Sequence, residues 1–205
     1  MNLWVSSRAI EVDKTAATTA VTSIKSKSNA MQGDGDDRTL VALTPDNRND
    51  IVAELAQAMN NETGRALVLE ELGKPAAGDV AEAAQAVLLA AKQDVNDAVD
   101  GLEESQQDAI RALLPIIPED TVLTEADVLN IQLINSMAST VIEIVNKSKA
   151  HPNEDISPED YKPLIKEALD IVDIVKGTAS SANIDMLANV DIAALMKQFM
   201  PGGAT

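Results

Sequence analysis

The sequence contains no cysteine, so disulfide bonds, thiolate metal sites and a cysteine nucleophile are excluded. Aromatic residues make up only 1% of the 205 residues, and they are Trp4, Tyr161 and Phe199. Surfaces that stack nucleic-acid bases on aromatic rings are therefore not expected. The core must instead be built from Ala, Val, Leu, Ile and Met, a composition that suits helices packed against helices.

Long hydrophobic runs are also missing. No uninterrupted apolar run reaches the roughly 18 residues of a membrane span, because Asp, Glu, Asn or Lys interrupts every expected helix. Residues 1–5 lack the basic segment and the apolar run of a signal peptide. We therefore expect a soluble protein, either in a virion or intracellular (cytoplasmic), with no membrane span.

Basic residues are scarce, and the net charge is −17. Residues 1–38 carry five basic and five acidic side chains, so the entire excess of acid lies in residues 39–205. Residues 94–127 hold ten acids against one base, Arg111, and we expect these acids largely on exposed helix faces. Such a charge opposes direct nucleic-acid binding. It suits either a solvated surface or a basic protein partner.

The clearest pattern lies in residues 124–145. Thr124 is suited to cap a helix, and Glu125 and Asp127 place negative charge in its first turn, where the helix dipole favours it. The residues that follow are apolar around most of the helix circumference, so other elements must cover most of it. The sequence therefore predicts an all-α fold, an acidic multi-helix bundle around a central buried helix at about 124–147.

The other expected helices lie in a domain that spans residues 39–200. Thr44 followed by Pro45 is a strong helix start, and a short helix is expected over 65–72, closed by Gly73. Residues 79–114 form either one long helix or two helices divided at Gly101. Further helices are expected after Ser157 and over 183–200, before a tail at 201–205.

Residues 1–38 differ from this domain. Short apolar alternations and a Ser/Thr/Ala run predict an arm, extended for much of its length, that cannot bury a core of its own. Removal of residues 1–30 is therefore expected to leave the helical body intact. The alternative is a disordered terminus. Trp4 is a plausible anchor on a neighbouring subunit. The predicted partner-binding residues of the arm are Leu3, Trp4, Val5, Ile10 and Val12.

The C-terminal segment is a second candidate contact. Its apolar residues Leu195, Phe199 and Met200 could form a docking helix on a partner. The alternative, that this last helix folds onto its own core, is equally consistent with the pattern.

No residue pattern indicates catalysis, a cofactor or a metal. His151, the only histidine, lies in a polar loop with no frame to orient it. Asp34, Asp36 and Asp37 fail the calcium-loop pattern, because Thr39 stands where Gly is needed and Pro45 where Glu is needed. The side chains of acidic pairs such as Glu103/Glu104 point about 100° apart on a helix, so they do not form a ready-made acid–base pair.

These patterns predict a non-enzymatic structural or assembly subunit of a large complex, without a cofactor. A virus or phage particle is the concrete case, by analogy with other chains that combine an arm with a helical body. Its partners would be other protein subunits. The alternative is an acidic inhibitor or regulator that imitates nucleic acid or occupies a basic groove.

Overall fold

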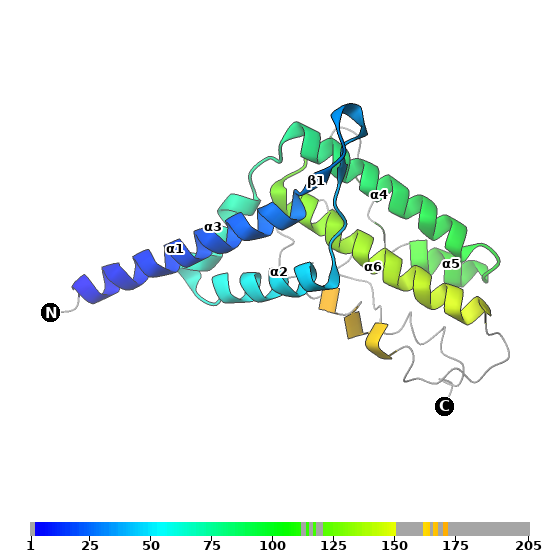
Figure 1. Cartoon of the computed structure of the whole chain (residues 1–205). Coiled ribbons are helices and arrows are strands. Elements are labelled where there is room, and N and C mark those ends of the chain that lie inside the picture. The colour runs from blue at the N-terminus through cyan, green and yellow to red at the C-terminus, as the bar shows by residue number, and fades with distance from the viewer. Residues whose placement is uncertain are drawn as a thin grey trace.

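A computed structural model describes residues 3–111, 114, 117, 121–150, 162–164, 166–167 and 170–171, with the backbone alone at 3–10, 12, 36, 105 and 109. These residues are predominantly helical, as the sequence predicts, and they include one two-stranded sheet (Figure 1). The helices are α1 (Leu3–Ser28), α2 (Pro45–Ala58), α3 (Glu62–Leu72), α4 (Gly78–Val99), α5 (Glu104–Arg111) and α6 (Glu125–Ala150). Strands β1 (Met31–Gln32) and β2 (Thr39–Leu40) flank a 3-10 turn, η1 (Gly35–Asp37).

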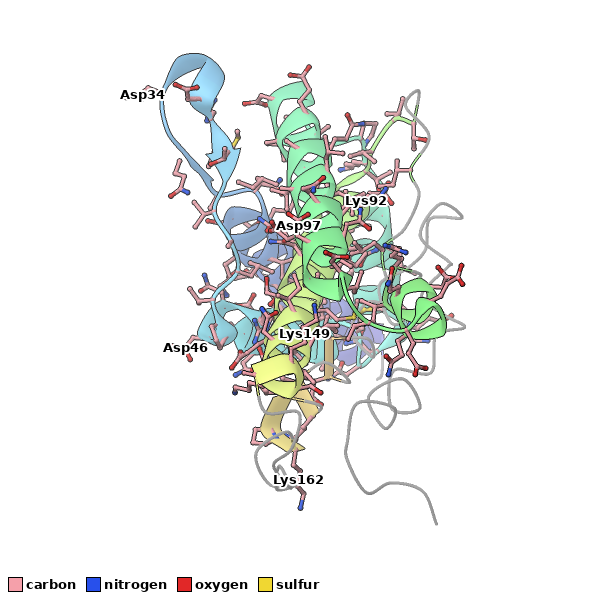
Figure 2. The ribbon with its side chains drawn as sticks, turned by 90° about the vertical axis from the view of Figure 1, so that its right-hand side faces the viewer. Asp34, Asp46, Lys92, Asp97, Lys149 and Lys162 are labelled. Carbon is pink, nitrogen blue, oxygen red and sulfur yellow. The ribbon has the colours of Figure 1, made fainter. Side chains whose placement is uncertain are left out.

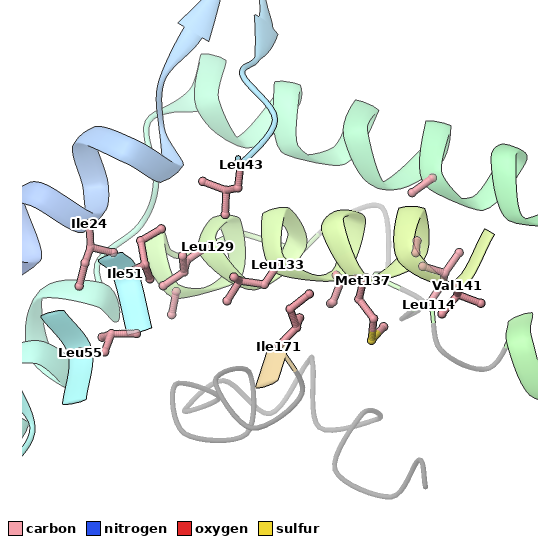
Figure 3. Close-up of a cluster of buried hydrophobic side chains, with 14 of the residues drawn as sticks. Ile24, Leu43, Ile51, Leu55, Leu114, Leu129, Leu133, Met137, Val141 and Ile171 are labelled. Carbon is pink, nitrogen blue, oxygen red and sulfur yellow. The ribbon is translucent and has the colours of Figure 1, made fainter. Parts of the chain in front are cut away.

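Helix α6 is buried over most of its length, where the sequence predicts a buried helix. Thr124 Oγ1 accepts a hydrogen bond from the Asp127 amide at 3.2 Å, and Asp127 Oδ2 accepts from the Thr124 amide at 2.8 Å. This reciprocal cap starts the helix as expected. Helix α4 packs along α6, and α1 and α3 also contact it. Figure 3 shows the α6 side chains Leu129, Leu133, Met137 and Val141 in one cluster with residues from elsewhere in the chain, which are Ile24, Leu43, Ile51, Leu55, Leu114 and Ile171.

Helix α6 is also long and apolar enough, by length and composition alone, to cross a membrane. An 18-residue window within α6 has a mean hydropathy of 1.4, but 78% of this window is buried inside the protein. A core helix must be apolar around its circumference because protein covers it on most sides. Its burial is therefore consistent with the soluble protein that we expected.

The region from 78 to 111 contains two helices. Helix α4 ends at Val99, and Gly101 follows with φ +83°, a left-handed conformation that favours glycine. The Leu102 amide donates to the Val99 carbonyl at 3.1 Å and tightens this turn. The turn at Gly101 therefore divides this region into two helices and excludes one long helix.

Helices α2 and α3 begin at side-chain caps. Thr44 Oγ1 accepts from the Asn47 amide at 3.1 Å, as the Thr–Pro start predicts. Helix α3 begins at Glu62, before the predicted residue 65, because Asn61 Oδ1 accepts from the Gly64 amide at 2.7 Å. A Cβ on Gly64 would lie 2.0 Å from the Ala58 carbonyl oxygen. This close approach of α3 to the end of α2 requires glycine.

The prediction of an extended arm is wrong, because residues 3–28 form the single helix α1. The threonines satisfy their hydroxyls within the helix: Thr15 donates to the Glu11 carbonyl at 2.9 Å, and Thr19 donates to the Thr15 carbonyl at 2.9 Å. β-branched residues lower helix propensity only slightly, and packing overrides that preference.

The second half of α1 belongs to the core. Ala17, Val21, Ile24 and Ser28 are all at most 3% exposed, and they recur at the steps of three and four that place residues on one helix face. Helix α1 packs against α2 and α3 and also contacts α6. In Figure 1 the first half runs on past α2 and α3, toward the N-terminus. Residues 1–38 therefore contribute to the core.

Candidate interaction surface

A groove of about 380 Å³ lies between α1 and α2, where the second half of α1 packs on the body. Most of its lining side chains are small, so the backbone of another helix could approach closely. Within α1, Ala16 and Thr19 are exposed and Ala20 is half-buried. The lining residues are Ala16, Thr19, Ala20, Ser23, Glu54, Gln57 and Ala58.

Three polar side chains meet beside this groove. Ser23 Oγ donates to Glu54 Oε1 at 2.9 Å, and Lys27 Nζ donates to the same Oε1 at 2.8 Å and to Ser23 Oγ at 3.1 Å. The hydrogen bond to Glu54 is the main cause that raises the pKa of Lys27, helped by the charges of Glu54 and Asp50 and opposed by burial. Lys27 therefore carries its positive charge at neutral pH.

The second carboxylate oxygen of Glu54 is buried. Among the residues that the structure describes, Glu54 Oε2 has no hydrogen-bond partner. A buried acceptor without a donor costs about 1–3 kcal/mol.

Lys27 is not placed to activate Ser23 as a nucleophile. A Ser–Lys pair activates its serine only when the lysine is neutral and can take the hydroxyl proton. Here Lys27 is held in its charged form, and the Ser23 proton is directed at Glu54. We did not single out these three residues from the sequence. Their signal is the helical spacing of 16, 20, 23 and 27, which an extended interpretation hides.

A second groove, of about 280 Å³, lies between α2 and residues 163–171. At this groove the Arg48 guanidinium donates to Ser136 Oγ of α6 and forms an ion pair with Glu167. Arg48 is only 8% exposed, and burial lowers its pKa. Ile171, at 2% exposure, joins the main core beside it. These contacts join Glu167 and Ile171 to the body.

Of the ten acidic residues in 94–127, eight lie in the described part of the chain and form two groups, and Glu119 and Asp120 lie outside it. Six of the eight lie exposed on α4, α5 and the turn between them, as predicted: Asp94, Asp97, Asp100, Glu103, Glu104 and Asp108. Figure 2 views this side, with Lys92 and Asp97 both on α4. The prediction fails for Glu125 and Asp127, which are buried at 7% and 1% exposure. Glu125 is paired with Lys25 of α1, and Asp127 accepts a hydrogen bond from the Thr124 amide.

The predicted partner-binding residues of the arm, Leu3, Trp4, Val5, Ile10 and Val12, all lie on the first half of α1. The C-terminal set, Leu195, Phe199 and Met200, lies outside the described residues, and so does His151. The structure therefore places the first set together along one helix and does not test the second.

Within the described part of the chain, no group of three or more His, Cys, Asp or Glu residues could hold a metal ion. The three aspartates at 34–37 form part of η1 and its cap. Comparison with family models, with curated proteins and with solved structures finds no match to this chain.

Proposed function

We propose that the protein is a non-enzymatic structural subunit of a large assembly, with a virus or phage particle as the concrete case. It would contact its neighbours through the first half of α1 and through the C-terminal residues Leu195, Phe199 and Met200. The observation that carries the proposal is the shape of α1. One continuous helix is anchored in the core over its second half and runs past α2 and α3 over its first half (Figure 1).

This anchoring makes the first half of α1 a prepared binding element. Its second half is fixed by the buried residues Ala17, Val21 and Ile24, so the start of the helix does not have to nucleate alone. A partner that binds a helix already formed loses less conformational entropy than one that must order an arm. The position of Trp4 on this half supports a contact there, since tryptophan is favoured in interface hot spots.

Two further features agree with this role. The cluster of Ser23, Lys27 and Glu54 holds its lysine charged, so Lys27 cannot take the proton of Ser23. Residues 1–38 are neutral although the chain carries −17, so two acidic copies would repel least where their α1 helices meet. The choice of a virus or phage particle as the assembly rests on analogy alone.

A second candidate is an acidic regulator that occupies a basic groove. It is favoured by the exposed acids of α4 and by Leu89, which is 70% exposed on the same helix. A helix that exposes both an apolar side chain and carboxylates suits a partner that is both basic and apolar. This candidate would contact its partner through α4, whereas the assembly subunit would contact its neighbours through α1.

Sedimentation velocity over a range of protein concentrations tests the proposal. We expect the wild-type chain to form species larger than its 21.7 kDa monomer, and Trp4→Ala to shift them toward the monomer. Thr22→Ala, on the exposed side of the second half of α1, is the matched control and should leave assembly unchanged. Assembly that persists in Trp4→Ala and disappears in Leu89→Glu would favour the regulator's surface instead.

A further inference from the structure

The second half of α1 contacts elements that follow the β1–β2 hairpin in the sequence. Lys27 Nζ donates to Glu54 Oε1 of α2 at 2.8 Å, and Lys25 Nζ pairs with Glu125 Oε1 of α6 at 2.9 Å. Ile24 is fully buried in the main core, to which α2, α3 and α6 also contribute side chains. We call the surface of α2, α3 and α6 that receives the second half of α1 the α1-binding surface.

Residues 33–38 form the turn of the hairpin that connects α1 to the α1-binding surface. On either side of this turn, β1 and β2 pair over two residues each. Gly33 and Gly35 have φ of +92° and +58°, in the left-handed region that favours glycine. Every residue of the turn whose burial the structure describes is exposed, and in Figure 1 the turn lies above the helices. We call residues 33–38 the hinge.

The hinge concentrates like charge in a tight turn. Three of its six residues are aspartates, Asp34, Asp36 and Asp37, and the Asp37 amide donates to the Asp34 carbonyl at 3.2 Å. Arg38, the one base of the hinge, is paired with Asp79 of α4 at 3.1 Å. An extended chain rises about 3.3 Å per residue, so an open hinge sets the three carboxylates farther apart than the turn does. Opening of the hinge therefore relieves repulsion within it.

Charge also favours the approach of a second α1 helix. Helix α1 carries four basic and two acidic side chains, whereas residues 39–205 carry the entire net charge of −17. A net positive helix is attracted to the acidic body of any copy of the chain. Two copies therefore attract each other through α1 although their bodies repel.

We infer that two copies of the chain exchange α1, so that α1 of each copy lies on the α1-binding surface of the other. The inference rests on the proposed assembly role and names the partner as a second copy. The exchanged pair keeps every contact between α1 and the α1-binding surface, and β1 of one copy pairs with β2 of the other in the same register. The hinge alone changes, from a turn to an extended link. Exchange of a terminal element in this way is a low-cost route to a dimer, because it requires no new interface.

Charge reversal in two separate variants tests the exchange. Lys27→Glu and Glu54→Lys each bring like charges together when α1 lies on its own chain. When the two variants exchange α1, both contacts again join opposite charges. The Lys27 and Glu54 side chains are 20% and 29% exposed, so neither substitution places a charge wholly out of solvent. The two full-length variants are unfolded in urea, refolded separately and as a mixture, and weighed by native mass spectrometry.

We expect the heterodimer to exceed each homodimer by roughly tenfold or more, because only the heterodimer avoids the juxtaposed like charges in both contacts. The matched control mixes Lys147→Glu with Glu143→Lys. This ion pair lies within α6, with side chains 47% and 53% exposed, so exchange of α1 does not separate its members. The control mixture should therefore contain its dimers in random proportions. Random proportions for the Lys27 and Glu54 variants, or no dimer from their mixture, would overturn the inference.

A hinge substitution gives an independent test. A Cβ at position 33 would lie 2.5 Å from the Asp37 carbonyl oxygen, and φ there is +92°, so Gly33→Ala strains the closed turn. We expect the dimer dissociation constant from sedimentation equilibrium to fall about tenfold or more, because exchange relieves this strain in both copies.

The control for Gly33→Ala is Gly101→Ala. Gly101 has φ +83° but lies between α4 and α5, outside the hinge, so its substitution should leave the dissociation constant within about threefold of the wild-type value. A dissociation constant that falls no further in Gly33→Ala than in Gly101→Ala would overturn exchange through this hinge.

Failure of the exchange is distinguishable from failure of the proposed assembly role. If the mixture of Lys27→Glu and Glu54→Lys gives no excess of heterodimer while the wild-type chain still assembles in a way that Trp4→Ala reduces, the assembly role stands and the exchange falls. If the heterodimer is in excess and Trp4→Ala leaves assembly unchanged, the exchange stands and the contact through the first half of α1 falls.

Discussion

Lys25 and Glu125 form an ion pair of 2.9 Å that ties the last turn of α1 to the first turn of α6. Asn29, just beyond α1, donates to the other oxygen of the same carboxylate at 2.6 Å. Glu125 is 7% exposed, so both of its oxygens depend on partners from α1 and the residue after it. Its charge also lies at the start of α6, where the helix dipole favours it.

We predict that Glu125→Ala lowers the free energy of unfolding by about 2–3 kcal/mol, since it removes a charged acceptor and leaves Asn29 without its partner. Glu125→Gln retains an acceptor and should cost less. Urea unfolding followed by circular dichroism measures both. Glu143→Ala is the control, because Glu143 is exposed and its pair with Lys147 lies on the surface of α6. Equal losses for Glu125→Ala and Glu143→Ala would mean that the buried contact adds nothing.

The same contact explains what sequence reasoning could and could not find. The starts of α2 and α6 follow from local chemistry, since Thr44 and Thr124 cap their own chain three residues on. The burial of Glu125 depends on Lys25 and Asn29, which are distant in the sequence. No local pattern marks an acidic residue as one that will find such partners.

The sequence predicts an extended arm in place of helix α1 for a related reason. Its Thr and Val residues favour strands when taken singly, and only the spacing of Ala17, Val21 and Ile24 indicates a helix. The groove site could not be predicted either, because Ser23 and Lys27 meet Glu54 only when α1 packs against α2. What decides both is tertiary packing, which outweighs weak local preferences.

The division of α1 into two halves predicts two different truncations. Removal of residues 1–14 should leave the thermal unfolding transition cooperative, because Ala17 is the first buried residue among the α1 side chains that the structure describes. Removal of residues 1–30 deletes Ala17, Val21, Ile24 and Ser28 from the core and should abolish that transition. Differential scanning calorimetry separates the cases. A cooperative transition in the chain without residues 1–30 would show that α1 is not part of the core.

Arg48 provides a third test, on the contact that joins Glu167 to the body. We predict that Arg48→Ala costs about 2–4 kcal/mol of unfolding free energy, because a buried guanidinium with two partners is lost. Arg48→Lys should recover only part of this, since an ammonium cannot reproduce a planar fork that reaches Ser136 and Glu167 together.

The control for Arg48 is Lys166→Ala in the same groove. Lys166 has a side chain 79% exposed, and its pair with Asp170 at 3.7 Å lies in solvent, so the change should stay within about 0.5 kcal/mol. Chemical denaturation measures all three variants. Full stability in Arg48→Lys would show that charge alone, without the fork geometry, holds this contact.

The exposed acids of α4 and α5 distinguish an assembly subunit from an acidic regulator. Asp94, Asp97, Glu104 and Asp108 are all exposed, so their replacement by Asn or Gln should not disturb the core. If the protein assembles through α1, these four changes should lower solubility, since the net charge falls in magnitude, and leave the sedimentation pattern nearly intact.

A regulator that binds a basic groove would behave differently. Its affinity for a basic probe such as polylysine should fall steeply with added salt, because exposed charges are screened beyond about 10 Å at 0.1 M. The four substitutions should then abolish binding, whereas Trp4→Ala should do nothing. We expect the opposite: assembly that is lost in Trp4→Ala and kept when the four acids are neutral. Loss of assembly in the neutralised chain, with Trp4→Ala harmless, would move the functional surface from α1 to α4, because only the exposed carboxylates would then distinguish the two variants.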